Sequence, residues 1–165
     1  MDLIFSKYDM RNSLLTRADE PVYEISTTRG TPLTMETTVI KKFRKDGEKE
    51  HMGLIELCRT EDKCEVWGKN MPPKSDGFFK KYEDVLRQSP GRSFVASDGQ
   101  KYTWKLASDG NQELCDQSKN IIATSEKAHS GFFSGKPSPA RLSIATAGVP
   151  MIDDIVTTFM AQMVR

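Results

Sequence analysis

The chain has 165 residues, a length that suits one domain and allows a buried core without disulfides or metal. Its 24 basic and 23 acidic residues leave a net charge of +1, which excludes a strong global attraction to nucleic acid or anionic membranes. The apolar stretch near the N-terminus covers only residues 3–5, and no apolar run approaches the roughly 20 residues that cross a bilayer. We therefore expect one domain over residues 1–165, cytoplasmic or nuclear, without signal peptide or transmembrane segment.

The three cysteines, Cys58, Cys64 and Cys115, are an odd number at spacings that match no metal motif. We expect them to be reduced thiols, mostly buried as small apolar residues. A Cys58–Cys64 bridge across a hairpin is the alternative.

Short β-type runs separated by turn residues fill most of the chain, a pattern typical of antiparallel barrels and sandwiches. The runs in the first half are residues 3–5, 13–16, 22–27, 34–44, 52–59 and 64–67. Those in the second half are residues 93–96, 101–106, 113–116, 120–124 and 141–146. Ser-Asp-Gly triplets at 75–77, 97–99 and 108–110 predict tight turns, because Asp-Gly readily adopts the positive φ angles of hairpins.

Two segments have helical periodicity. Residues 78–88 form a short amphipathic pattern, and residues 150–164 form a stronger one that begins at Pro150 and carries Asp153 and Asp154 in its first turns. The apolar face of the second segment is too broad for one flat sheet. We therefore expect a curved or closed sheet around it, with Ile155, Phe159 and Met163 among the most buried side chains.

The hairpin at residues 92–105, with its Ser-Asp-Gly turn and Tyr-x-Trp-Lys strand, resembles the hallmark of a large family of uncharacterised fungal domain proteins. Residues 113–116 and 121–123 fit the next two strands of that pattern, and residues 12–15 and 21–25 are also similar. The fungal family is itself similar to the tubby-like superfamily, which includes tubby C-terminal domains, plant LURP-one-related proteins and phospholipid scramblases.

This resemblance implies a fold that the residue pattern also favours. We expect a mainly β protein, a closed antiparallel tubby-like barrel around a C-terminal apolar helix, with one short additional helix at residues 78–88. The fungal family has no established activity that the resemblance could imply for this chain. Tubby domains bind phosphoinositides through basic residues, and those positions are not matched here one by one.

Basic and aromatic side chains supply the candidate site. A basic run could bind anionic ligands, and two Phe-Phe pairs flanked by Gly and Lys could anchor at a membrane interface. The anionic-ligand candidates are Lys41, Lys42, Arg44, Lys45, Lys80 and Lys81, and the interfacial candidates are Phe78, Phe79, Phe132 and Phe133. The structural alternatives are a solvated strand edge for the lysines and burial for the rings.

Catalytic signatures are weak. His51 and His129 have no nucleophile motif around them, and the acidic pairs at 61–62 and 153–154 suit a turn and a helix start. We predict a non-enzymatic domain without cofactor or metal that binds acidic phospholipid head groups or another ligand at the membrane surface. A protein-interaction module that uses loops at one barrel end is the alternative, and nucleic acid is disfavoured because neither tryptophan lies within the basic run.

Overall fold

The computed structural model describes residues 1–31, 34–58, 62–71, 91–129 and 137–163. These residues form twelve strands, a 3-10 turn and one α-helix. The strands are β1 (Asp2–Phe5), β2 (Asn12–Arg17), β3 (Glu20–Arg29), β4 (Thr34–Phe43), β5 (Lys49–Cys58), β6 (Lys63–Val66), β7 (Lys69–Met71), β8 (Arg92–Val95), β9 (Lys101–Leu106), β10 (Gln112–Cys115), β11 (Ile121–Glu126) and β12 (Arg141–Ile144). The 3-10 helix η2 (Thr146–Met151) leads into α1 (Ile152–Met163).

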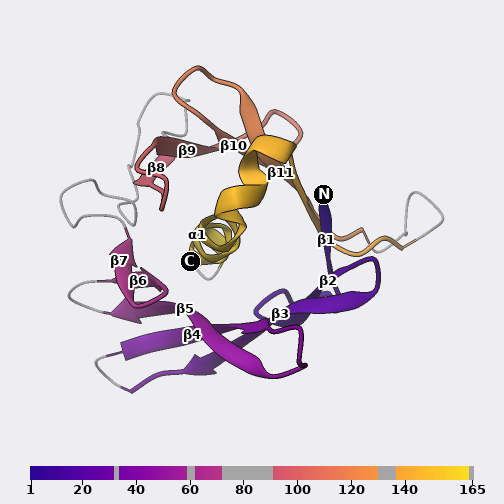
Figure 1. Ribbon diagram of the computed structural model, residues 1–165, viewed down its shortest axis with the longest axis vertical. Coiled ribbons are helices and arrows are strands. Elements are labelled where there is room, and N and C mark those ends of the chain that lie inside the picture. The colour runs from indigo at the N-terminus through magenta and orange to yellow at the C-terminus, as the bar shows by residue number, and fades with distance from the viewer. Residues whose placement is uncertain (32–33, 59–61, 72–90, 130–136, 164–165) are drawn as a thin grey trace.

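All twelve strands belong to one antiparallel sheet, in the order β7-β6-β5-β4-β3-β2-β1-β12-β11-β10-β9-β8. The sheet curls around α1 into a nearly closed barrel, as the view down its axis shows (Figure 1). The first and last strands lie side by side, because Leu3 of β1 pairs with Leu142 of β12. The prediction of a mainly β barrel around a C-terminal helix is therefore confirmed.

Turn chemistry fixes the hairpins as the sequence predicted. Gly99 and Gly110 both have positive φ, at 78° and 82°. The preceding aspartates accept backbone hydrogen bonds two residues on, from Gln100 to Asp98 and from Asn111 to Asp109. The Ser-Asp-Gly triplets at 97–99 and 108–110 are thus hairpin turns.

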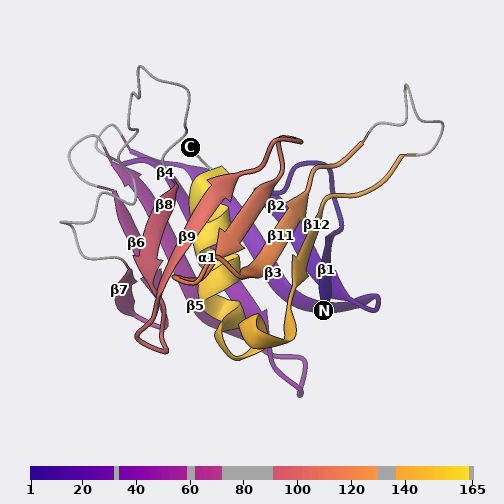
Figure 2. The same ribbon diagram turned by 90° about the horizontal axis from the view of Figure 1, so that it is seen from above.

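Helix α1 fills the barrel, as the second view shows (Figure 2). Ile155 and Phe159 are 0% and 2% exposed, as predicted, whereas Met163 is only partly buried. The prediction for Met163 is wrong because α1 ends at that residue, where the surrounding strands no longer cover it fully. Pro150 lies inside η2, so the α-helix begins two residues later than expected.

The helix is buried on its polar side as well as on its apolar face. Thr157 and Thr158 are both fully buried. Close approach on the β5 side depends on Gly53, where a Cβ would lie 2.8 Å from the Thr157 hydroxyl oxygen. The barrel therefore encloses the helix nearly all round.

Several predicted features lie outside the described residues. These are the Ser-Asp-Gly turn at 75–77, the helix at 78–88 and Lys80 and Lys81, together with the four candidate phenylalanines Phe78, Phe79, Phe132 and Phe133.

Candidate functional site

Four side chains from distant parts of the chain converge at the barrel end where α1 begins. Tyr23 of β3, Lys42 of β4 and Trp67 of the β6–β7 turn all contact Asp153 in the first helical turn; we call these four residues the Asp153 cluster. The Asp153 carboxylate accepts hydrogen bonds from the Tyr23 hydroxyl at 2.6 Å, the Lys42 ammonium at 2.8 and 2.9 Å, and the Trp67 indole Nε1 at 3.0 Å. Both carboxylate oxygens are therefore engaged.

Charge in the cluster is balanced locally. The Lys42 Nζ lies 5.8 Å from the centre of the Tyr23 ring and 5.9 Å from that of Trp67, so two aromatic faces and one carboxylate surround the ammonium. Burial, and then the Asp153 charge, raise the pKa of Tyr23, which therefore stays a neutral donor. Lys42 keeps only a third of its side-chain surface exposed.

Trp67 is held in an unusual backbone conformation. It has φ 51° and Gly68 has φ 72°, while Val66 and Lys69 on either side form a strand pair. Two successive positive φ angles define a tight turn that favours Asn, Asp or Gly, and a bulky residue there is strained. Trp67 nevertheless remains 42% exposed, with its polar edge turned to Asp153 and part of its ring in contact with solvent.

Asp154, the next residue, has a different environment. It is 2% exposed and accepts hydrogen bonds from both the backbone N–H and the hydroxyl of Ser97, at the start of the β8–β9 turn. Its carboxylate forms no ion pair with any described lysine or arginine. Burial raises the pKa of Asp154, partly offset by the bonds from Ser97.

The predicted basic residues separate into two groups. Lys42 points toward α1 and is neutralised by Asp153, whereas Lys41 is exposed and pairs in register with Glu24 and His51. Arg44 and Lys45 are exposed in the β4–β5 turn, and Arg44 is 3.6 Å from Asp46. Within the described parts of the chain, neither Lys41 nor Lys45 forms an ion pair.

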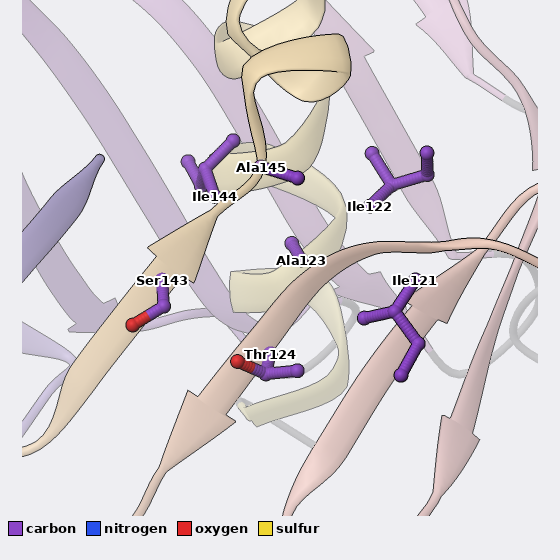
Figure 3. A pocket seen from close by; sticks show the side chains of 7 residues that line it. All are labelled: Ile121, Ile122, Ala123, Thr124, Ser143, Ile144 and Ala145. Carbon is purple, nitrogen blue, oxygen red and sulfur yellow. The ribbon is translucent and has the colours of Figure 1, made fainter.

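A shallow depression of about 260 Å³ lies elsewhere, where β11 meets β12 (Figure 3). Its lining is mostly apolar, with Thr124 and Ser143 as its polar side chains. Ile121 at its rim is half-exposed. No titratable side chain lines this depression, so it offers a surface for apolar contact rather than for acid–base chemistry.

Other reactive groups are scarce in the described residues. All three cysteines are free thiols, and burial raises the pKa of Cys64 to about 12, which disfavours the reactive thiolate. No group of three or more His, Cys, Asp or Glu side chains there is placed to hold a metal ion. Across the same residues, no helix is long and apolar enough to cross a membrane.

Comparison with protein families gives a match over most of the chain. The model of a family of unknown function, DUF6593, matches residues 8–164. The chain belongs to the DUF6593 family. Neither curated proteins nor solved structures give a match. In this DUF6593 domain, the matched residues include every member of the Asp153 cluster as well as Asp154 and Ser97.

Sequence reasoning found Lys42 and Asp153 in this DUF6593 domain but gave them separate roles, and it missed Tyr23 and Trp67. One local signal for Trp67 was available, because the Trp67-Gly68 pair follows a β-type run directly. The convergence itself has no local signal, since it needs the register of β3 with β4, the β6–β7 turn and the placement of the start of α1.

Proposed function

We propose that this DUF6593 domain is a non-catalytic binding module and that the barrel end around the Asp153 cluster binds the acidic head groups of a membrane surface. The observation that carries the proposal is the exposed Trp67 ring beside the basic strand, with its polar edge held by Asp153 and part of its ring open to solvent. Tryptophan with one wet edge and one apolar body is enriched at membrane–water interfaces.

The surrounding charges support an anionic ligand of modest affinity. Lys41 and Lys45 lie on and next to the end of β4 without an ion pair among the described residues, and Arg44 has only a long contact with an exposed aspartate. Lys42 is already neutralised, so its role is to hold the cluster together. Each free basic side chain near an anionic surface contributes about 1 kcal/mol at most, and salt weakens that contribution.

Flotation tests the proposal directly. The double variant Lys41→Glu/Lys45→Glu should bind vesicles of phosphatidylcholine and phosphatidylserine on the order of tenfold more weakly than the wild type, and added salt should weaken the wild type in the same way. The matched control is Lys101→Glu/Lys105→Glu, which makes the same charge change at exposed positions of β9, on the opposite wall of the barrel (Figure 1). Wild-type protein that ignores these vesicles, or equal losses in both double variants, would contradict the proposal.

A protein-interaction role is the second candidate, favoured by the apolar depression between β11 and β12 and its half-exposed Ile121. It predicts no vesicle binding by the wild type. It also predicts an association, seen by sedimentation as concentration is raised, that Ile121→Asp weakens. Lack of any association in that experiment would count against it.

A further inference from the structure

Lys42 is surrounded by the kinds of group with which proteins bind organic cations. Its Nζ lies 2.8 and 2.9 Å from the two Asp153 carboxylate oxygens, and 5.8 and 5.9 Å from the centres of the Tyr23 and Trp67 rings. Aromatic faces within about 6 Å of a cation attract it, and proteins use such rings to bind quaternary ammonium ligands such as choline. We call Tyr23, Trp67 and Asp153 the cation cage, and the ammonium of Lys42 occupies it.

The cage is built without the help of Lys42 and is accessible from one side. The Tyr23 hydroxyl and the Trp67 indole Nε1 both donate to the Asp153 carboxylate, at 2.6 and 3.0 Å, so the three members position one another. Tyr23 is fully buried and forms the inner side of the site, whereas Trp67 is partly exposed. A third of the Lys42 side chain is exposed as well, so this flexible chain can turn outward into solvent.

The backbone at Trp67 supports a binding role for its ring. The φ angles of 51° at Trp67 and 72° at Gly68 belong to a tight turn that favours Asn, Asp or Gly. A bulky residue in this conformation is strained, and such strain is concentrated at ligand sites. A smaller residue at position 67 would close the β6–β7 turn with less strain, but the cage would then have one ring instead of two.

Replacement of the Lys42 ammonium by another cation keeps the charges balanced. Asp153 retains a positive partner, and the freed ammonium, a strongly hydrated group, returns to water. The distances of 5.8 and 5.9 Å lie near the outer limit for a cation beside an aromatic ring, so the carboxylate binds Lys42 more strongly than the rings do. A larger and more weakly hydrated quaternary ammonium gains more from the two rings and loses less hydration on entry.

We propose that the cation cage binds the trimethylammonium group of choline, either free or in the phosphocholine head group of a lipid, and that Lys42 closes the cage when no ligand is bound. In a phosphocholine ligand the displaced Lys42 ammonium is free to pair with the neighbouring phosphate. The site stands on the contacts of its own members and does not need the proposed attraction to anionic head groups, because the group it takes is a cation.

Nuclear magnetic resonance of the ¹⁵N-labelled full chain tests the site. The chain has two tryptophans and therefore two indole N–H signals, and Trp104 is buried. Choline chloride should shift the Trp67 signal in a saturable way and leave the Trp104 signal in place, whereas sodium chloride at the same concentration should not reproduce the shift. Phosphocholine should bind more tightly than choline. Vesicles of pure phosphatidylcholine distinguish the sources: they should broaden the Trp67 signal if the ligand is a lipid, and leave it sharp if the ligand is free choline or phosphocholine.

Substitution of the lysine separates the cage from a surface effect of salt. Lys42→Ala removes the competing ammonium and should bind choline on the order of tenfold more tightly than the wild type. The added change Asp153→Asn should abolish that binding. Lys49→Ala is the matched control, because Lys49 lies 2.8 Å from a Glu24 carboxylate oxygen and 5.2 Å from the centre of the Phe43 ring. It removes a lysine from a carboxylate and an aromatic ring outside the cage and should leave choline binding unchanged.

The wild-type titration decides the proposal, even if Lys42→Ala does not fold. A Trp67 signal that ignores both choline and phosphocholine would overturn it, as would an equal response to sodium chloride. A response of Lys42→Ala without one of the wild type would also overturn it, because Lys42 would then be a permanent part of the structure that no ligand displaces.

Discussion

Two adjacent aspartates show how surroundings decide what a residue contributes. Asp153 has a cation, a phenol and an indole as partners, so its charge is compensated. Asp154 is buried with hydrogen-bond donors but with no cationic partner among the described residues, and burial raises its pKa. An ionised carboxylate in that position lowers the free energy of unfolding unless its donors offset the lost hydration.

Replacement of Asp154 by asparagine should therefore raise the free energy of unfolding at neutral pH, because the amide oxygen still accepts the Ser97 bonds and no charge is buried. A carboxyl whose folded pKa is raised contributes stability at low pH that is lost as the pH rises through that pKa. The advantage of Asp154→Asn over the wild type should thus shrink as the pH falls through the raised pKa of Asp154. Urea denaturation of both proteins over a pH series measures the difference.

Asp153→Asn is the matched contrast to that change. It leaves the half-buried Lys42 ammonium without its counter-charge and should lower the free energy of unfolding by about 1–3 kcal/mol. Asp19→Asn, an exposed residue whose φ of 68° asparagine tolerates, serves as the control and should stay within about 0.5 kcal/mol of the wild type. If both aspartates of the helix start respond alike, their assigned environments are wrong.

At the scale of elements, strand prediction succeeded where apolar and polar residues alternate along the chain. Tyr102 and Trp104 alternate with polar residues in β9, and the predicted bounds of that strand match the observed ones. β7 has three residues, Lys-Asn-Met, too few to show any alternation, and it exists because the Trp67-Gly68 turn folds it back onto β6. Neighbouring structure, rather than local preference, explains the strand that was missed.

The site was less predictable than its supporting elements. The basic run and the acidic helix start are visible in the sequence, but only the register of β3 with β4 places Tyr23 opposite Lys42. Trp67 joins them through a turn whose backbone conformation disfavours tryptophan. Sequence patterns describe one segment at a time, so they cannot show that Tyr23, Lys42 and Trp67 lie together in the fold.

Packing of α1 against β5 gives a test at the same scale. Gly53→Ala should lower the free energy of unfolding by about 1–3 kcal/mol, because the new Cβ would meet the Thr157 hydroxyl oxygen at 2.8 Å and Ile40 carbons at 3.3 Å. In a Thr157→Ala background the first clash disappears, so the same change should cost less. Thermal or urea unfolding of the four proteins in this double-mutant cycle measures the coupling, and strictly additive effects would contradict the proposed contact.

At the scale of the whole molecule, strand pairing joins parts of the chain that are far apart in sequence. β1 pairs with β12, and the N-terminal amine donates to the Ile144 carbonyl at 2.7 Å. The sheet thus consists of two runs of strands that are neighbours in sequence, β1–β7 and β8–β12, and the pairing of β1 with β12 joins the two runs. The helix that fills it follows the last strand directly, so wall and core depend on each other.

Phe159 tests that dependence. Its ring lies 6.1 Å from Phe5 of β1 and 5.6 Å from Trp104 of β9, measured between ring centres, so one side chain contacts two separate walls of the barrel. Phe159→Ala should lower the free energy of unfolding by about 3–5 kcal/mol, a large share of the roughly 5–15 kcal/mol that stabilises a typical domain.

Met163→Ala, at the partly buried end of the same helix, should cost clearly less and serves as the control. Deletion of residues 150–165 removes the whole helix and should leave an aggregated or molten protein, because the apolar inner faces of the strands would then have nothing to pack against. Urea titrations measure the free energy of unfolding, near-ultraviolet circular dichroism detects a molten state, and light scattering detects aggregation. A truncated chain that stays monomeric and unfolds in one sharp transition would show that the sheet holds its shape without α1, and the helix would then be an addition to the barrel rather than its core.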